Sequence, residues 1–569
     1  MRKIINGLRF LLTPQDKWRM IAITLLLAVG SMLEIVGLGL VMPIVAVFSK
    51  PELLEQNKWL RLFRQLFSCF DNSQFLLICC LLLILLYIVK NIWTFVTIKI
   101  YTVFIFNRLS SMSLRIYSGF LHSPYLLFAR HGKVGLLNII HRVEIVCNYV
   151  LISGMTIFVD VLSILFICGV LAFTIPWVVL GCAVIFGVGS MAIWLPLRKI
   201  NLDIGEGMNK YGDKLNKVIL YSFEDIKTIK VAGCEDAFTD HFMEYRRAKS
   251  RYNAAYYVIG QFPRLALETV AVLSAVIVLM IMLLRGEAIG TVILSFSLLI
   301  TAMARLLPAV SRINYGMSNI RVGTPAFEEV IDGLKWQNED LGDPDSRFEF
   351  KNEIKIKDLE FSYPGSTEKI FSGLNLTIRR NESLAVTGPT GGGKSTFIDL
   401  LLGLYQLDSG SVEVDGKNIF DALGAWRKLI GFVPQHIVLD DASIAANVAV
   451  GCKDSEIDRE RVMEVLKIAQ LEDVVNALPE GMETVIGDNG MRLSGGQRQR
   501  IGIARALYKD PEIIIFDEAT SALDSETEQA LIDAVEKLHG RKTMIMVAHR
   551  LSTVEKCEKH IRIDFHGRD

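Results

Sequence analysis

The chain has two halves with different hydrophobic patterns. Long apolar runs dominate up to about residue 313, whereas beyond about residue 336 short apolar stretches separated by polar turns are typical of a soluble α/β protein. We therefore predict a helical membrane domain over residues 1–335 and an α/β domain over residues 336–569. Runs near or above the ~20 residues that cross a bilayer as a helix lie at 18–48, 75–95, 150–173, 178–197, 258–284 and 289–310.

The connections between these six predicted transmembrane helices indicate their orientation. Tight turns join the third run to the fourth and the fifth to the sixth, whereas 96–149 and 198–257 are long connections rich in Lys and Arg. Positive charge marks cytoplasmic connections. The two long connections, both termini and the α/β domain are thus expected in the cytosol, and the helices in the inner (cytoplasmic) membrane.

The connection between the first two runs has a pattern of its own. Residues 51–69 place leucine and aromatic residues at helical spacing, with Lys58, Arg61 and Arg64 between them. This pattern predicts an amphipathic helix that either lies at the outer membrane surface or packs on its own protein.

Composition excludes some classes of function. The 61 Lys and Arg balance the 61 Asp and Glu, so the basic excess typical of a nucleic-acid binder is missing and no nucleic-acid partner is expected. The nine cysteines do not follow metal-ligand spacing. The first residues do not resemble a secretory signal peptide, because no short apolar stretch with a small-residue cleavage site is found there.

A phosphate-binding motif follows a strand-like run, Ser383–Val386, and precedes an apolar helix. Glycines in such a loop let backbone N–H groups face phosphates, Lys394 neutralises the β/γ charge, and Ser395 offers its hydroxyl to Mg²⁺. The motif therefore predicts ATP and Mg²⁺ as cofactors. Its residues are Gly388, Pro389, Thr390, Gly391, Gly392, Gly393, Lys394 and Ser395.

A buried-strand pattern, 513–516, ends in two carboxylates. Asp517 is suited to hold the magnesium shell through water, and Glu518, one step beyond the strand, is suited to polarise the attacking water. The alternative is a strand end with solvated acids, which the preceding phosphate-binding loop disfavours.

The pentapeptide Leu493–Gln497, LSGGQ, lies between these two motifs. With it the chain resembles ABC exporters over essentially its full length. The resemblance implies that Tyr363 stacks on adenine, Gln435 links magnesium to the membrane domain, and His549 senses the γ-phosphate. It also implies that the segment 521–524 crosses a dimer interface.

The resemblance implies an ABC-exporter fold, six transmembrane helices plus an α/β P-loop ATPase cassette, and ATPase activity coupled to transport. A helix that opens with Ser494-Gly495-Gly496 presents N–H groups and a positive dipole, which in the family close on ATP held by another subunit. One cassette per chain then implies a homodimer with head-to-tail cassettes. Further residues that this resemblance assigns to the nucleotide site are Thr396, Gln497 and Asp524, with Ser395, Gln435 and Asp517 toward magnesium and Glu518 and His549 as catalytic residues.

Ionisable residues within the apolar runs bear on the cargo, because burying them in a membrane is costly. Three cations, Lys90, Arg264 and Arg305, fall on three different helices and would form a cationic cavity for a phosphate-bearing substrate. Glu34, Asp160 and Glu268 fall in or near the same runs. The alternative is that some of these ionisable residues lie in cytoplasmic helix extensions or pair locally, as between Arg264 and Glu268.

The local sequences around these cations resemble flippases of polyprenyl-diphosphate-linked oligosaccharides. The resemblance implies ATP-driven flipping of such an amphiphile, with membrane lipid and the lipid-linked oligosaccharide as partners. A general exporter of lipids, drugs or peptides remains an alternative, and an ATP-gated channel or regulator is another.

Overall fold

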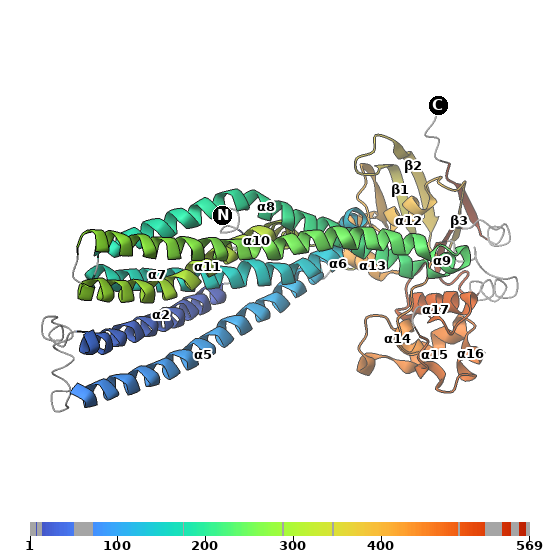
Figure 1. Cartoon of the computed structure of the whole chain (residues 1–569). Coiled ribbons are helices and arrows are strands. Elements are labelled where there is room, and N and C mark those ends of the chain that lie inside the picture. Colours follow the sequence, from blue (N-terminus) through green and yellow to red (C-terminus); the bar gives the residue numbers. More distant parts are fainter. Residues whose placement is uncertain are drawn as a thin grey trace. The chain divides into compact units, whose positions relative to one another are not determined.

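The computed structural model describes residues 7, 14–49, 72–174, 176–286, 289–343, 346–487, 490–517, 537–547 and 557–564. The chain divides into two compact units (Figure 1). The first comprises Met1–Ser123 and Leu127–Asn338 and is helical; the second comprises Pro124–Leu126 and Glu339–Asp569 and is α/β.

Every predicted apolar run lies in a helix. Stretches long and apolar enough to span a membrane, among the described residues, are Leu77–Leu121, Tyr125–Gly169 and Glu235–Leu284; the count of six spans stays a prediction. The helices are α2 (Pro14–Ser49), α5 (Asn72–Leu121), α6 (Tyr125–Ile145), the π-helical η1 (Val146–Leu151), α7 (Ile152–Thr174), α8 (Pro176–Glu224), α9 (Ile226–Ala232), α10 (Glu235–Leu284) and α11 (Ile289–Gly333).

The long helices pack against one another within the first unit. Helix α8 contacts α10 and α11, α11 contacts α7, and α2 contacts α5 and α7 (Figure 1). Helices α5, α8 and α10 extend well into the two long basic connections. In the first of these connections, Arg142 of α6 is buried and forms ion pairs with Asp213 of α8 and Glu329 of α11. The charge of this one side chain therefore joins three helices. The predicted amphipathic helix 51–69 lies outside the described residues, as does the side chain of Glu34.

The second unit contains two sheets. The antiparallel sheet has the order β2-β1-β4-β5, and the parallel sheet has the order β6-β7-β8-β3-β9. The antiparallel strands are β1 (Glu353–Ser362), β2 (Lys369–Arg379), β4 (Ser409–Val414) and β5 (Lys417–Asn418). The parallel strands are β3 (Ser383–Thr387), β6 (Ile430–Val433), β7 (Ile513–Asp517), β8 (Thr543–Val547) and β9 (Lys559–Arg562).

Two apolar cores hold this unit together. One takes buried side chains from both sheets and from α12 and α13, including Phe361, Phe397 and Trp426. The indole N–H of Trp426 donates to the Leu401 carbonyl at 2.7 Å. The other lies around α14 to α17. The helices are α12 (Lys394–Leu401), α13 (Leu423–Lys428), α14 (Ile444–Val448), α15 (Arg459–Ile468), α16 (Glu472–Asn476) and α17 (Gly495–Tyr508), with 3₁₀ turns η2 (Ile419–Ala422), η3 (Asp454–Glu456) and η4 (Gly481–Glu483).

Candidate functional site

The loop between β3 and α12 is folded tightly enough to require glycine. Gly388 has φ 148°, and a Cβ there would lie 2.0 Å from the carbonyl oxygen of Ile563. A Cβ at Gly392 would lie 2.9 Å from the same oxygen. Lys394 is 5% exposed, and its Nζ donates to the carbonyl oxygens of Gly388 and Pro389 at 3.0 Å each. The loop therefore wraps around the ammonium group.

The residues on either side of Lys394 present the remaining groups of this loop. Pro389, Thr390 and Gly391 are exposed, and Gly393, with φ 97°, precedes the first turn of α12. The hydroxyl-bearing Ser395 is also exposed. The first N–H groups of a helix have no intrahelical acceptor, so this end of α12 offers donors to an anion.

Tyr363 lies beside the loop, although 31 residues separate it from Lys394 in the sequence. Its hydroxyl is 2.8 Å from Oγ1 of Thr396. Its ring packs edge-on against Phe361, with centroids 5.3 Å apart, and against Tyr405 at 5.6 Å. The structure thus brings the predicted adenine-stacking residue and Thr396 to the phosphate-binding loop.

Two of the predicted magnesium residues follow neighbouring strands at the same edge of the parallel sheet. Asp517 ends β7, and Gln435, which is exposed, follows β6 by two residues; the two strands pair in parallel with Val433 opposite Phe516. Burial and, second, the negative charge of Asp517 raise the pKa of Asp399 on α12 to about 6. The two carboxylates are therefore close enough to disfavour each other's charge.

These groups fit ATP and Mg²⁺. Mg²⁺ prefers oxygen ligands, and the site offers the hydroxyl of Ser395, the amide oxygen of Gln435 and the carboxylate of Asp517. Because Mg²⁺ keeps several of its waters, Asp517 would bind it through one of them. A divalent cation would also offset the charge shared by Asp399 and Asp517. Lys394 and the N-terminal N–H groups of α12 would hold the phosphates. When bound, the metal would supply charge neutralisation to the phosphoryl oxygens.

The LSGGQ segment forms the start of α17. Ser494 accepts from the backbone N–H of Gln497 at 3.2 Å, and the Gln497 side chain accepts from the Ser494 N–H at 2.9 Å, which is a capping box. The N–H groups of Gly495 and Gly496 have no acceptor within the helix. The signature sequence therefore builds an ordered helix start with two glycine donors, as expected of an anion-binding end.

Three predicted site residues lie outside the part of the chain that the structure describes. They are Glu518 and His549, assigned to catalysis, and Asp524 in the interface segment. Their neighbours Asp517 and Val547 are paired across adjacent strands β7 and β8. Their roles stay predictions.

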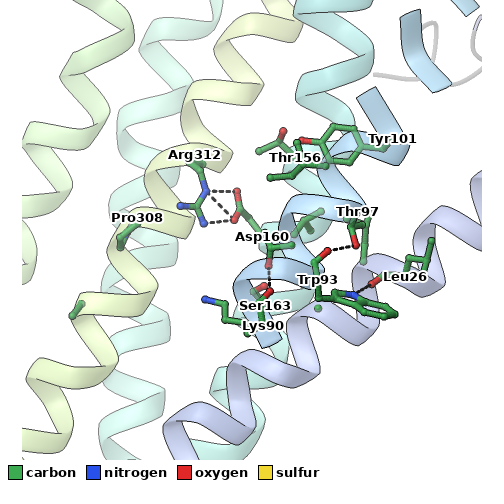
Figure 2. A pocket seen from close by; sticks show the side chains of 16 residues that line it. Leu26, Lys90, Trp93, Thr97, Tyr101, Thr156, Asp160, Ser163, Pro308 and Arg312 are labelled. Atoms are coloured by element: carbon green, nitrogen blue, oxygen red, sulfur yellow. Dashed lines mark hydrogen bonds and ion pairs between the residues drawn. The ribbon is translucent and has the colours of Figure 1, made fainter. Parts of the chain in front are cut away.

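A cavity of about 580 Å³ lies within the first unit, between α2, α5, α7 and α11 (Figure 2). Lys90 of α5 lines it, and so do Asp160 of α7 and Arg312 of α11, which form a bidentate ion pair. Pro308 and Ala304 also line it. Because Pro308 carries no N–H, the Ala304 carbonyl lacks its usual helical donor on this wall.

The three cations predicted to bind the cargo are placed differently. Lys90 lines the cavity, Arg264 is exposed on α10, which contributes none of the described lining residues, and the side chain of Arg305 is outside the description. Arg312 was missed because it follows the last apolar run by two residues. The signal that could have found it is its spacing of seven from Arg305, which places both on one helix face.

Comparisons with known proteins agree with this geometry. The sequence model of the ABC transporter family matches residues 371–521. A protein of Ralstonia nicotianae named "ATP-dependent lipid A-core flippase" is 31% identical over 466 residues, which cover 81% of this chain and 78% of the relative. A protein of the same name from Cupriavidus pinatubonensis is 32% identical over 471 residues, 81% of this chain and 79% of the relative.

A solved structure shares the fold. It is that of a bacterial Atm1-family ABC exporter with ATP bound, with a TM-score of 0.78, 20% sequence identity, and coverage of 96% of this chain and 93% of that one.

A P-loop cassette joined to a membrane-embedded helical unit defines the class of ATP-hydrolysing membrane transporters. The chain belongs to the ABC transporter family. It is an integral membrane protein that binds ATP with Mg²⁺, and the exporter fold predicted from the sequence is confirmed.

Proposed function

We propose that a homodimer of this chain uses ATP hydrolysis to flip an amphiphilic lipid across the inner membrane, and that the lipid is a polyprenyl-diphosphate-linked oligosaccharide. Both cassettes and both termini then face the cytosol. In this proposal Glu518 polarises the attacking water, His549 contacts the γ-phosphate, and each signature helix serves the partner's phosphate-binding loop.

One observation carries the choice of cargo: a cavity in the helical unit is lined by cations. Lys90 lies in a stretch apolar and long enough to span a membrane, where a charged side chain is costly unless it has a function or a partner. Doubled in a dimer and joined by Arg264 and Arg305, Lys90 would form a receptor for the two phosphates.

The names of the relatives favour a second candidate cargo. Both are called lipid A-core flippases, so a lipid of that type is the alternative to the polyprenyl-linked oligosaccharide. In both cases the substrate is an amphiphile with a large polar head, and the same ATP-driven step moves it.

The test is transport by reconstituted vesicles. We expect the parent protein to flip a fluorescent polyprenyl-diphosphate-linked oligosaccharide with ATP, and Arg264→Ala/Arg305→Ala to abolish this flipping while ATP hydrolysis without cargo largely continues, because the nucleotide site lies in the other unit. Lys99→Ala, an exposed lysine on the same helix as Lys90, is the control and should flip normally. Undiminished flipping by the double variant would show that these arginines do not bind the cargo. Transport of a lipid A-core probe, without transport of the oligosaccharide probe, would identify the second candidate as the cargo.

A further inference from the structure

The buried acid of the cavity described above is held by an exposed base. The Asp160 side chain is 3% exposed, whereas that of Arg312 is 55% exposed. Arg312 donates from Nε to both carboxylate oxygens, at 3.1 and 3.0 Å, and from Nη2 to Oδ1 at 2.5 Å. The pair joins α7 to α11, and 152 residues of sequence separate its members.

The described residues that line this cavity carry more positive than negative charge. Lys90, Asp160 and Arg312 are the ionisable side chains among its described lining residues other than the phenol of Tyr101, which gives two positive charges against one negative. The hydroxyls of Thr94, Thr97 and Thr156 also line it, but each donates its hydrogen to a backbone carbonyl of its own helix. The two cations are therefore the charged donors among the described lining residues.

The walls have the size and rigidity of a ligand site. The volume of about 580 Å³ falls within the range of ~300–1,000 Å³ usual for small-molecule sites. The indole N–H of Trp93 donates to the Leu26 carbonyl at 3.0 Å, which fixes one aromatic wall between α5 and α2. Figure 2 shows the side chains of Lys90 and Arg312 in the same cavity as this wall.

We propose that this cavity binds the phosphate or diphosphate group of an anionic lipid, and that Asp160 is an internal counter-ion which the phosphate displaces from Arg312. This inference rests on the proposed function. A phosphate matches the guanidinium fork as a carboxylate does, so Arg312 exchanges one acceptor for another. Lys90 supplies a second positive charge for a diphosphate.

The exchange gives the cargo a means to act on the helices. In the ion-paired form Arg312 connects α11 directly to α7; in the ligand-bound form it contacts the phosphate. A ligand shifts a conformational equilibrium only through contacts that differ between two states, and this exchange is such a difference. Asp160 is therefore a positioning residue that also sets specificity, because it excludes ligands too weakly charged to displace it.

The test measures binding of farnesyl diphosphate, with farnesol as the neutral probe, to the full chain in detergent with its nucleotide sites saturated with ADP. We expect Asp160→Asn to bind farnesyl diphosphate about tenfold more tightly than the parent, because the competing charge is gone. The double variant Asp160→Asn/Arg312→Gln should bind it at least about tenfold more weakly than Asp160→Asn, and Lys90→Gln should bind it at least about tenfold more weakly than the parent. Affinity for farnesol should not change.

Controls separate this role from a structural one. Arg312→Gln alone would leave the buried carboxylate without its guanidinium and could fail to fold, so the neutral double variant is used instead. Lys99→Gln should bind like the parent. If Asp160→Asn melts at lower temperature but binds farnesyl diphosphate like the parent, the pair only clamps α7 to α11 and the inference is wrong. The same holds if no variant distinguishes farnesyl diphosphate from farnesol.

The two proposals fail separately. If the charge-dependent binding pattern appears but vesicles do not flip the polyprenyl-diphosphate-linked oligosaccharide, the cargo assignment is wrong and the anion site stands. If that oligosaccharide is flipped and Asp160→Asn leaves the affinity for farnesyl diphosphate unchanged, the cargo assignment stands and the role of Asp160 is overturned.

Discussion

Single residues in the cassette owe their role to immediate neighbours. Lys394 is buried at 5% exposure, and its ammonium is held by two carbonyl oxygens of its own loop. Asp399, one turn further along α12, has its pKa raised to about 6 by burial and by Asp517. The positive charge of Lys394 and the carboxylates of Asp399 and Asp517 thus lie near α12. The cation suits the phosphates, and the carboxylates suit magnesium.

At the residue scale, we expect Glu518→Gln to lower ATP hydrolysis by ~10²–10⁴, the usual loss when a positioned base is removed. ATP binding should persist and trap a closed dimer, because the phosphate-binding loop is unchanged. Steady-state hydrolysis and binding of radiolabelled ATP would be measured together. Glu512→Gln is the matched control: Glu512 precedes β7 as Glu518 follows it, and it pairs with Arg380. Near-parent hydrolysis by Glu518→Gln would show that another residue activates water.

At the scale of elements, backbone shape limits which residues each motif accepts. The loop after β3 is closed against the segment that follows β9, where the Ile563 carbonyl meets Gly388. The start of α17 is closed by the reciprocal hydrogen bonds of Ser494 and Gln497. Both motifs therefore put main-chain N–H groups at a helix start, one by glycine packing and the other by capping.

The glycine requirement can be tested with two alanines. We expect Gly388→Ala to lower the free energy of unfolding of the cassette by about 2–4 kcal/mol, because positive φ and a backbone clash add together. Gly365→Ala is the control: its φ is +90°, but nothing lies within 4 Å of the added Cβ, so about 1–2 kcal/mol of strain is expected. Thermal melting of the full chain in detergent measures both. Equal losses would show that φ alone, and not the Ile563 carbonyl, restricts position 388.

At the scale of the whole molecule, the two units have separate cores and separate tasks. The apolar cores of the cassette contain residues of that unit alone, and the Asp160–Arg312 cavity is built from the helical unit alone. A single chain carries one phosphate-binding loop and one signature helix. The dimer proposed above would let the signature helix of one chain complete the nucleotide site of the other.

Mixed dimers test this arrangement. In a dimer of one Ser494→Arg chain and one Lys394→Ala chain, we expect one intact site and one doubly altered site, so photo-crosslinked ATP should label the Ser494→Arg chain. Both substitutions on one chain, paired with the parent, should instead damage both sites, because each site then has one altered half. Labelling of the second mixture on its parent chain, with loss of labelling in the first, would mean that each chain completes its own site.

The sequence by itself determined the division into two domains, the helical nature of the apolar runs and the nucleotide motifs. These features are contiguous: a run of apolar residues must satisfy its backbone hydrogen bonds as a helix in a membrane, and a glycine-rich loop acts within eight residues. Tyr363 and Gln435, by contrast, were assigned to the site only through a family resemblance. The structure brings Tyr363 to Thr396 and Gln435 to the sheet edge of Asp517.

Only the tertiary structure decided how the ionisable residues of the membrane unit are arranged. The sequence singled out Asp160 but did not pair it with Arg312, since no periodic pattern relates residues 152 positions apart. A buried carboxylate is stable only where packing supplies a cation, and that choice depends on how α7 lies against α11. Contacts within a helix follow from its 3.6-residue period, whereas contacts between helices depend on which faces pack together.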